Sequence, residues 1–457
     1  METKSFLKKG LFITTCLLFQ TSVFGQDSLA VSTEPTDTVL NLDLSQAITI
    51  ALDQNPTIRV AGMEIEKANY AKKESVANLF PSITATGSYQ RTIEKQTMSM
   101  AGQSMKIGSD NSWAAGFSAQ LPLINVPLWQ SIKLTSEAVM EKVEKSRGSK
   151  ISQVSSVISA YYAVLNAQDS YEVLQKSLNT ANENLRITKK RFENGQTSEY
   201  DVIQAEVQVR NIQPTLLSCK NGIELAKMQL RVLTNLPADF SIEVKGKLSD
   251  YVNDDYRGMM MEELDSSLVD NPNMRLLEVS TTLLERQLKL QKANWYPTLG
   301  AQFVYQWTSL NDDFKFADYE WNPYSTLSLS LAWPIFQGGS RIYKQKQAQI
   351  ALDEMEYTKE DTRRKLLMQL ESCVDNLNVA AENIRSTKEA MALAEKALSI
   401  TQKRYEVGAG SSLELTSAEN ALTQSSLAYY QAIYNYIIAK NGVDEVIGNA
   451  YGQYVQQ

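Results

Sequence analysis

Residues 366–405 read LLMQLESCVDNLNVAAENIRSTKEAMALAEKALSITQKRY and contain neither glycine nor proline. The uninterrupted stretch is longer still, because no glycine or proline occurs between Gly339 and Gly408. Within it, apolar or small residues recur alternately four and three positions apart: Leu366, Leu370, Cys373, Leu377, Ala380, Ile384, Thr387, Met391, Ala394, Leu398, Thr401 and Tyr405. This spacing is the seam of a coiled coil. It predicts a helical rod on the order of 100 Å long, which needs neighbours along its whole length.

The same pattern occurs earlier in the chain. Between Pro127 and Gly195 only Gly148 interrupts the stretch. Its seam consists of Val157, Ala160, Val164, Ala167, Tyr171, Leu174, Leu178, Ala181, Leu185, Thr188 and Phe192. Short motifs recur with it at nearly constant offsets: Asn55-Pro56 as Asn271-Pro272, and KRFENG at 190–195 as KRYEVG at 403–408. We therefore predict two structural repeats, each with a helix, a strand, a loop, a strand, a very long helix and a returning helix.

Four shorter segments alternate apolar with small polar residues. They predict strands at about 81–91, 113–123, 297–307 and 325–335, each about the length of a tilted strand that spans a bilayer. All six tryptophans lie within or beside these segments: Trp113, Trp129, Trp295, Trp307, Trp321 and Trp333. Because interfacial aromatic girdles explain such segregation, we favour membrane strands over two hairpins that pack on the helices of a soluble protein.

The composition excludes several classes of protein. The 457 residues contain no histidine, which rules out Ser-His-Asp triads, His-based zinc sites and His-ligated haem. The formal net charge of −7 argues against nucleic acid as a partner. Cys219 and Cys373 stand far apart and have no metal-like spacing. We expect no enzyme activity, no cofactor and no metal site.

The N-terminus predicts an exported protein. Lysines precede the apolar stretch 11–24, which is typical of a secretory signal peptide at 1–25. The remaining divisions are expected as follows: a flexible leader at 26–42; a first repeat at 43–235, with its long helix at about 128–193 and its return helix at about 198–235; an equatorial linker at 236–258; a second repeat at 259–448, with its long helix at about 340–406 and its return helix at about 411–448; and a tail at 449–457.

Four strands are too few for a membrane-spanning sheet. Unpaired backbone N–H and C=O groups at a sheet edge cost several kcal/mol each in lipid, so the edges must find partners. About eight strands are the practical minimum for a closed barrel. The chain must therefore pool strands with copies of itself, as eight strands from two copies or twelve from three. A water-filled pore favours three copies, because an eight-stranded interior is filled by side chains.

Together, these features resemble the TolC family of outer-membrane efflux channels. The resemblance rests on the duplicated order, the Asn-Pro pairs, the turns RFENG (191–195) and RYEVG (404–408), and PIFQGG (334–339), and it covers about residues 43–448. It implies a mostly α-helical homotrimer with a 12-stranded β-barrel in the outer membrane, continued by a 12-helix α-barrel across the periplasm. It also implies a periplasmic adapter (membrane fusion) protein and an inner-membrane RND or ABC transporter as partners.

The resemblance predicts a passive outer-membrane channel of a tripartite efflux or type I secretion system. Two alternatives are a periplasmic adapter and a coiled-coil structural surface protein. An adapter needs compact β-rich domains around a single helical hairpin, whereas this chain has two hairpins. A surface fibre would not explain the paired strands or the position of the tryptophans.

The helix turns at 193–201 and 406–414 are predicted to form the periplasmic tip. Ser198-x-x-Asp201 and Ser411-x-x-Glu414 each fit a capping box. The resemblance implies further roles here: Glu414 in an acidic ring at the closed entrance, Asp201 and Tyr405 in a hydrogen-bonded gate, and adapter docking at the turns with Arg191, Gly195, Arg404 and Gly408.

The chain departs from the family pattern at two tip positions. Ser417 stands where a second acid of the ring is expected, and Gly410 stands where a gating arginine is expected. The first change should weaken any block by cations, and the second removes the ionic part of the gate. We therefore expect a looser or differently held gate, in which Asp201→Ala raises the conductance only a little.

Overall fold

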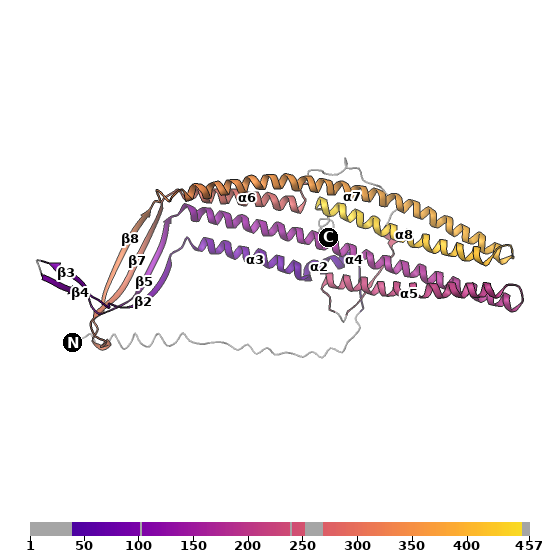
Figure 1. The fold of residues 1–457 in the computed structure, drawn as a ribbon, viewed down its shortest axis with the longest axis horizontal. Helices are drawn as coiled ribbons and strands as arrows, with labels where there is room; N and C mark the ends of the chain where they lie inside the picture. The colour runs from indigo at the N-terminus through magenta and orange to yellow at the C-terminus, as the bar shows by residue number, and fades with distance from the viewer. Residues whose placement is uncertain (1–38, 101–102, 238–239, 252–267, 450–457) are drawn as a thin grey trace.

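The computed structural model describes residues 39–100, 103–237, 240–251 and 268–449 (Figure 1). The predicted signal peptide, most of the leader and nearly all of the tail lie outside these residues. The molecule is elongated, with a sheet at one end and long helices that run away from it to a tip (Figure 1). No helix among the described residues is both long enough and apolar enough to cross a bilayer.

Two long rods dominate the fold. Helix α4 (Val126–Glu193) has 68 residues and α7 (Ser340–Glu406) has 67. Each turns back into an antiparallel helix of 36 residues, α5 (Glu199–Thr234) after α4 and α8 (Ser412–Ile447) after α7. The predicted seam faces the packed side: in α7 all twelve of its residues are buried or half-buried, and in α4 only Phe192 is exposed. The apolar spacing therefore explains how each rod packs on its neighbours.

Three shorter helices complete the helical part. They are α2 (Leu44–Gln54), α3 (Pro56–Ala77) and α6 (Pro272–Ala293). Helices α3 and α6 lie beside the sheet-proximal halves of the rods and end just before the strands (Figure 1). In space, α3 begins beside the end of α5 and continues in the same direction (Figure 1). In the same way, α6 begins beside the end of α8 and continues its direction (Figure 1).

The repeated Asn-Pro pairs form these junctions. Asn271 Oδ1 accepts hydrogen bonds from the backbone N–H groups of Asn273 and Met274 at 2.9 and 3.1 Å, and Asn271 Nδ2 donates to the Val446 carbonyl of α8 at 2.7 Å. Asn55 acts in the same way in the first repeat: its amide nitrogen donates to the Leu233 carbonyl of α5 at 2.9 Å. One side chain thus caps a new helix and satisfies a carbonyl at the end of another.

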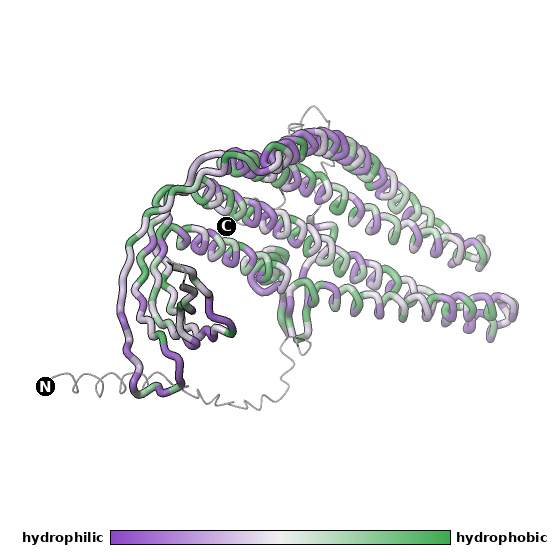
Figure 2. The backbone as a smooth tube through the Cα atoms, turned by 60° about the vertical axis from the view of Figure 1, so that its left-hand side comes forward, coloured by the Kyte–Doolittle hydropathy of each residue, from purple (hydrophilic) through white to green (hydrophobic). Residues whose placement is uncertain are grey.

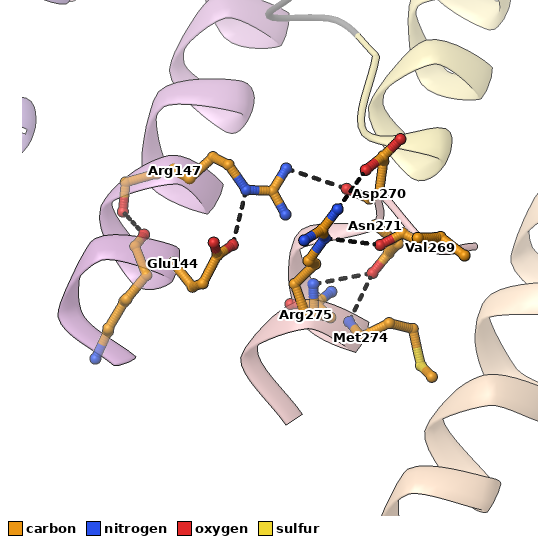
Figure 3. Close-up of polar contacts among 10 residues, drawn as sticks. Glu144, Arg147, Val269, Asp270, Asn271, Met274 and Arg275 are labelled. Atoms are coloured by element: carbon orange, nitrogen blue, oxygen red, sulfur yellow. Dashed lines mark hydrogen bonds and ion pairs between the residues drawn. The ribbon is translucent and has the colours of Figure 1, made fainter. Parts of the chain in front are cut away.

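Arginines surround the second junction (Figure 3). Arg147 of α4 donates to the Asp270 carbonyl at 3.1 Å and pairs with Glu144 at 2.8 Å. Arg275 donates to the Val269 carbonyl at 3.0 Å and pairs with the Asp270 carboxylate at 2.9 Å. Arg147 thus ties the start of α6 to α4, while Asn271 ties it to α8.

Removing the Asn271 side chain should weaken this junction. Asn271 is 2 % exposed, so Asn271→Ala loses a cap and leaves the buried Val446 carbonyl without its donor. We expect a loss of about 2 kcal/mol in the free energy of unfolding. Thermal denaturation of the purified protein in detergent measures it. The exposed neighbour Asn273→Ala is the control, with an expected change within about 0.5 kcal/mol. Equal melting temperatures for the two variants would contradict the assignment.

A small parallel sheet closes the middle of the molecule. Strand β1 (Val39–Leu42) pairs with β6 (Ser241–Val244), and a 3-10 turn η1 (Leu248–Tyr251) follows. Leu42, Ile242 and Leu248 are 0–1 % exposed and belong to the largest hydrophobic core cluster of the described residues. The predicted flexible leader at 26–42 is therefore wrong for residues 39–42. The alternation of apolar and polar residues cannot be recognised in a strand of four residues, and the partner strand lies about 200 residues away in the sequence.

The main sheet has four antiparallel strands. They are β2 (Ser82–Arg91), β5 (Asn111–Ile124), β7 (Thr298–Asn311) and β8 (Asn322–Ala332), in the order β2-β5-β7-β8. A 3-10 turn η3 (Phe316–Asp318) lies between β7 and β8. The segment between β2 and β5, which we predicted as a loop, contains a further hairpin of β3 (Gln96–Met100) and β4 (Gln103–Ile107). Within the described residues, β2 and β8 are edge strands.

Candidate functional site

The two faces of the main sheet differ in chemistry. One row across all four strands joins Ile83, Ala119, Phe303 and Leu327, and the neighbouring row joins Ser82, Gln120, Gln302 and Ser328. Successive residues of a strand point to opposite faces, so the first row lies on one face and the second row on the other. The apolar face is exposed in the single chain, since Ile83 and Leu327 are 73 % and 74 % exposed. Figure 2 shows the sheet as a curved layer in which hydrophobic and hydrophilic residues alternate along the strands.

Aromatic side chains gather at both ends of these strands. At the end far from the helices, the Trp113 ring lies 4.2 Å from that of Tyr89 and 4.8 Å from that of Phe316. At the helix end, Trp333 Nε1 donates to the Trp295 carbonyl at 3.3 Å. Two aromatic bands that flank an apolar sheet face are the pattern of a membrane-spanning sheet.

The opposite end of the molecule contains two turns of nearly the same geometry. After α4, Gly195 has φ +69°, and the N–H of the next residue donates to the Arg191 carbonyl at 2.8 Å. After α7, Gly408 has φ +77°, and the N–H of the next residue donates to the Arg404 carbonyl at 2.8 Å. The left-handed conformation explains why glycine recurs at this place in both repeats.

The two return helices begin differently. Ser198 Oγ accepts from the Asp201 N–H at 3.3 Å, while the Asp201 carboxylate accepts from the Ser198 N–H at 3.2 Å, which completes the predicted capping box. Hydrogen bonds from the hydroxyls of Thr197 and Ser198 hold the pKa of Asp201 below its usual range. Asp201 is therefore a carboxylate at neutral pH.

The second capping box is only half formed. Ser411 Oγ accepts from the Glu414 N–H at 3.2 Å, but the Glu414 carboxylate lies 3.6 Å from the Arg404 guanidinium. Arg404 also donates to the Ala409 carbonyl at 3.1 Å, so it holds the turn and the acid together. The expectation of a full capping box at Glu414 is thus wrong, because a cation lies within reach of its carboxylate.

The predicted pairing of Asp201 with Tyr405 is not formed among the described residues. The ring of Tyr405, which is 8 % exposed, lies under the Arg191 guanidinium at 4.5 Å, and its hydroxyl is 3.3 Å from Thr188 Oγ1. Arg191 also donates to the Tyr405 carbonyl at 3.2 and 3.3 Å and to the Glu406 carbonyl at 3.3 Å. We call Thr188, Arg191 and Tyr405 the Arg191 latch, since they join the end of α4 to the end of α7.

The remaining predicted tip residues have fewer contacts. Ser417 is exposed on α8. Gly410 packs its backbone near Tyr405, where an added Cβ would lie 3.2 Å from the Tyr405 nitrogen. No group of three or more candidate metal ligands lies together within the described residues.

Glu419 lies near the tip, in α8, and was not among the residues predicted from the sequence. It is 8 % exposed, and Asn184 of α4 donates to its Oε1. Burial raises the pKa of Glu419 to about 7, and the hydrogen bond from Asn184 opposes part of that rise. A signal was present, because α8 has its own four-three seam and Glu419 occupies one position of it: Leu415, Glu419, Leu422, Ser426, Tyr429 and Ile433.

Known outer membrane proteins are similar to this chain in sequence. A family model described as outer membrane efflux protein matches residues 47–236 and 264–449. The outer membrane protein TolC of Vibrio cholerae is 21 % identical over 438 residues, which cover 94 % of each chain. The alkaline protease secretion protein AprF of Pseudomonas aeruginosa is 21 % identical over 401 residues, 87 % of this chain and 82 % of that one.

Solved structures share the fold. A crystal structure of CusC has a TM-score of 0.73 at 16 % identity and covers 92 % of this chain and 95 % of its own. The outer membrane protein VceC of Vibrio cholerae has a TM-score of 0.71 at 16 % identity, with 89 % and 96 % covered.

Proposed function

Because the chain belongs to the outer membrane efflux protein family, we propose that three copies close into one passive duct from the periplasm to the exterior. Membership assigns the protein to the outer membrane and to the channels of efflux and secretion systems. The observation that carries the proposal is the main sheet, which is apolar on one face, polar on the other and unpaired at β2 and β8 within the described residues.

Closure by copies would remove both free edges. An edge strand in lipid leaves backbone N–H and C=O groups without partners, and a closed barrel has no edge. Pairing β8 of one copy with β2 of the next satisfies both strands, and three copies bring twelve strands together. A barrel of that size encloses water behind its inward polar residues, whereas about eight strands leave an interior filled by side chains.

The helical part also exposes apolar residues that neighbouring copies could cover. Helix α5 has a stripe of exposed apolar residues spaced mostly three and four apart: Tyr200, Ile203, Val207, Leu217, Leu225, Met228 and Val232. On α7, Val379, Leu393 and Ile400 are also more than half exposed. Extended apolar surface on a single chain marks an interaction site. It supports a tunnel in which α5 of one copy lies beside the second hairpin of the next.

The tip is the proposed entrance. Its turns at Gly195 and Gly408 would receive a periplasmic adapter, which would connect the duct to an inner-membrane RND or ABC transporter. The Arg191 latch would hold the entrance closed, because it joins the ends of the two rods. Glu414, bound to Arg404 in the single chain, would line the entrance with its copies.

Purification from the outer-membrane fraction tests the duct. We expect detergent-solubilised protein with the mass of three chains by light scattering, a heat-modifiable band on gels, and ion conductance in planar bilayers. The same sample after boiling is the matched control and should lose both the band and the conductance. A protein that stays monomeric in the absence of detergent would overturn the proposal.

A further inference from the structure

We propose that Glu419 is a proton-binding positioning residue, which fastens the first helical hairpin (α4 and α5) to α8 near the tip when protonated and loosens it when ionised. The hairpin contact itself does not depend on the channel proposed above. Only the expectation that loosening this contact opens the entrance, and so raises the conductance, rests on that function. The two can therefore be tested separately.

The carboxyl of Glu419 occupies an unusual place for a charge. It lies in the seam of α8, about two turns from the start of the helix, where its neighbours Leu415 and Leu422 are apolar. Asn184 Nδ2 is its one hydrogen-bond donor, and no cation pairs with it among the described residues. An ionised carboxylate in such a site costs several kcal/mol of hydration unless it is paired, so the packed arrangement favours the neutral acid.

Glu419 is one of several polar bridges between the first hairpin and α8. Three others lie between Asn420 and Gln431 of α8: they join Ser177 Oγ with Thr423 Oγ1 at 3.0 Å, Gln208 Nε2 with Asn420 Oδ1 at 2.6 Å, and Asn166 Nδ2 with Gln431 Oε1 at 3.1 Å. Far from the tip, near the other end of α8, Ser155 Oγ donates to Glu445 Oε2 at 2.6 Å. Hydroxyls and amides do not change charge between pH 5 and 9. Among the bridges between Glu419 and Gln431, Glu419 alone can make the contact near the tip depend on protons.

Other titratable groups line the surroundings of Glu419, but none of them offsets the effect of burial on its carboxyl. Asp169, Glu172 and Lys176 of α4, Glu395 of α7 and Tyr430 of α8 line a groove that includes Glu419. Tyr405 of α7 lines a second, smaller cavity that also includes Glu419. Helix α5 contributes Ala205 and Gln208, neither of which is charged. Lys176 has the only positive side chain among them. Burial remains the dominant influence on the pKa of Glu419, and Asn184 the one that opposes it.

The direction of the pH effect follows from these pKa values. A water-exposed glutamate has a pKa near 4.5, whereas packing raises that of Glu419 to about 7. The packed state therefore binds the proton more tightly, and it is fully favoured below about pH 4.5. As the pH rises through 7, the packed carboxyl ionises and the contact loses this advantage. We expect the hairpin and α8 to separate more often in mildly alkaline solution.

Cross-linking across a neighbouring bridge measures the separation. Ser177→Cys and Thr423→Cys are introduced into the full chain with Cys219→Ser and Cys373→Ser, and the rate of disulfide formation is followed from pH 5.5 to 8.5. Thiolate formation itself depends on pH, so each rate is divided by that of the same protein with Glu419→Gln. We expect this ratio to fall at least about fivefold as the pH rises. Each unit of pKa difference between the two states can change their equilibrium up to about tenfold, so a difference of more than two units allows a change of this size.

Two further variants keep the test decisive. Glu395→Gln removes an exposed carboxyl of the same groove and should leave the pH dependence unchanged. Glu419→Asp retains a carboxyl and should keep the dependence. If the glutamine variant fails to fold, Glu419→Ala, which also lacks a titrating group, takes its place as the reference. A ratio that does not change with pH would overturn the inference. If the ratio falls while the conductance stays constant, Glu419 is still the proton site of the hairpin contact. The separation of the first hairpin from α8 then does not open the channel.

Discussion

A channel that carries Leu327→Arg is expected to be largely absent from the outer membrane, whereas its neighbour Ser328→Arg should assemble. Both residues lie in the middle of β8, the edge strand whose outward and inward positions alternate. Leu327 belongs to the apolar row with Ile83 and Phe303, and Ser328 to the polar row with Gln302. The two substitutions therefore place one charge on opposite faces of the same strand.

The expected difference is large because lipid and water treat the charge differently. An arginine at the bilayer midplane of a β-barrel costs about 2–4 kcal/mol, and in the proposed trimer that cost would apply three times. On the polar face the same guanidinium stays hydrated. We expect Ser328→Arg to insert and to shift the ion selectivity of the pore toward anions.

The measurements are the heat-modifiable fraction in outer membranes and the reversal potential in planar bilayers. Equal assembly of the two variants would mean that the sheet does not have one face in lipid. Better assembly of Leu327→Arg than of Ser328→Arg would reverse the assignment of the faces.

The four strands of the main sheet could be predicted because their period of two persists for about ten residues. Pairs such as Leu327 and Ser328 show which face is apolar without any knowledge of the partner strand. The strands β1 and β6 have four residues each, and each pairs with a segment about 200 residues away. The strands β3 and β4 are neighbours in the sequence, but their five residues each are too few for the alternation to stand out. The long rods were equally accessible, since their seams continue without a slip.

The tip was harder to predict because its contacts cross between helices. Glycine at 195 and 408 follows from the turn itself, so local sequence suffices there. The partner of Tyr405 depends on how α4 lies against α7, which brings Arg191 and not Asp201 to its ring. Glu419 occupies a recognisable seam position, but its burial depends on the first hairpin packing over it.

Replacing Arg191 should open the channel far more than replacing Asp201. The Arg191 guanidinium donates to two carbonyls at the end of α7 and lies over the Tyr405 ring, so it links the two rods. The Asp201 carboxylate accepts its hydrogen bonds from Thr197 and Ser198, within its own turn. Loss of Asp201 therefore weakens a helix cap, whereas loss of Arg191 removes a connection between hairpins.

The sizes of these contacts set the expected conductance. A hydrogen bond from a charged group contributes about 1.5–3 kcal/mol, and a cation over an aromatic ring about 0.5–1 kcal/mol. If the latch holds the closed state, Arg191→Ala weakens it by about 2 kcal/mol, which raises the open population roughly thirtyfold. Asp201→Ala should raise it less than about threefold. Single-channel recordings in planar bilayers compare the two proteins under one set of conditions.

Two intermediate variants separate the parts of the latch. Arg191→Lys keeps the charge but loses the planar fork that reaches both carbonyls, so it should open the channel to an intermediate degree. Tyr405→Phe removes only the hydroxyl contact with Thr188 and keeps the ring beneath the guanidinium, so its effect should be small. If Asp201→Ala opens the channel more than Arg191→Ala, the contact that holds the entrance forms only in the assembled protein and involves Asp201. In the order predicted here, the closed entrance is instead held within each chain, by an arginine of the first rod that binds the end of the second.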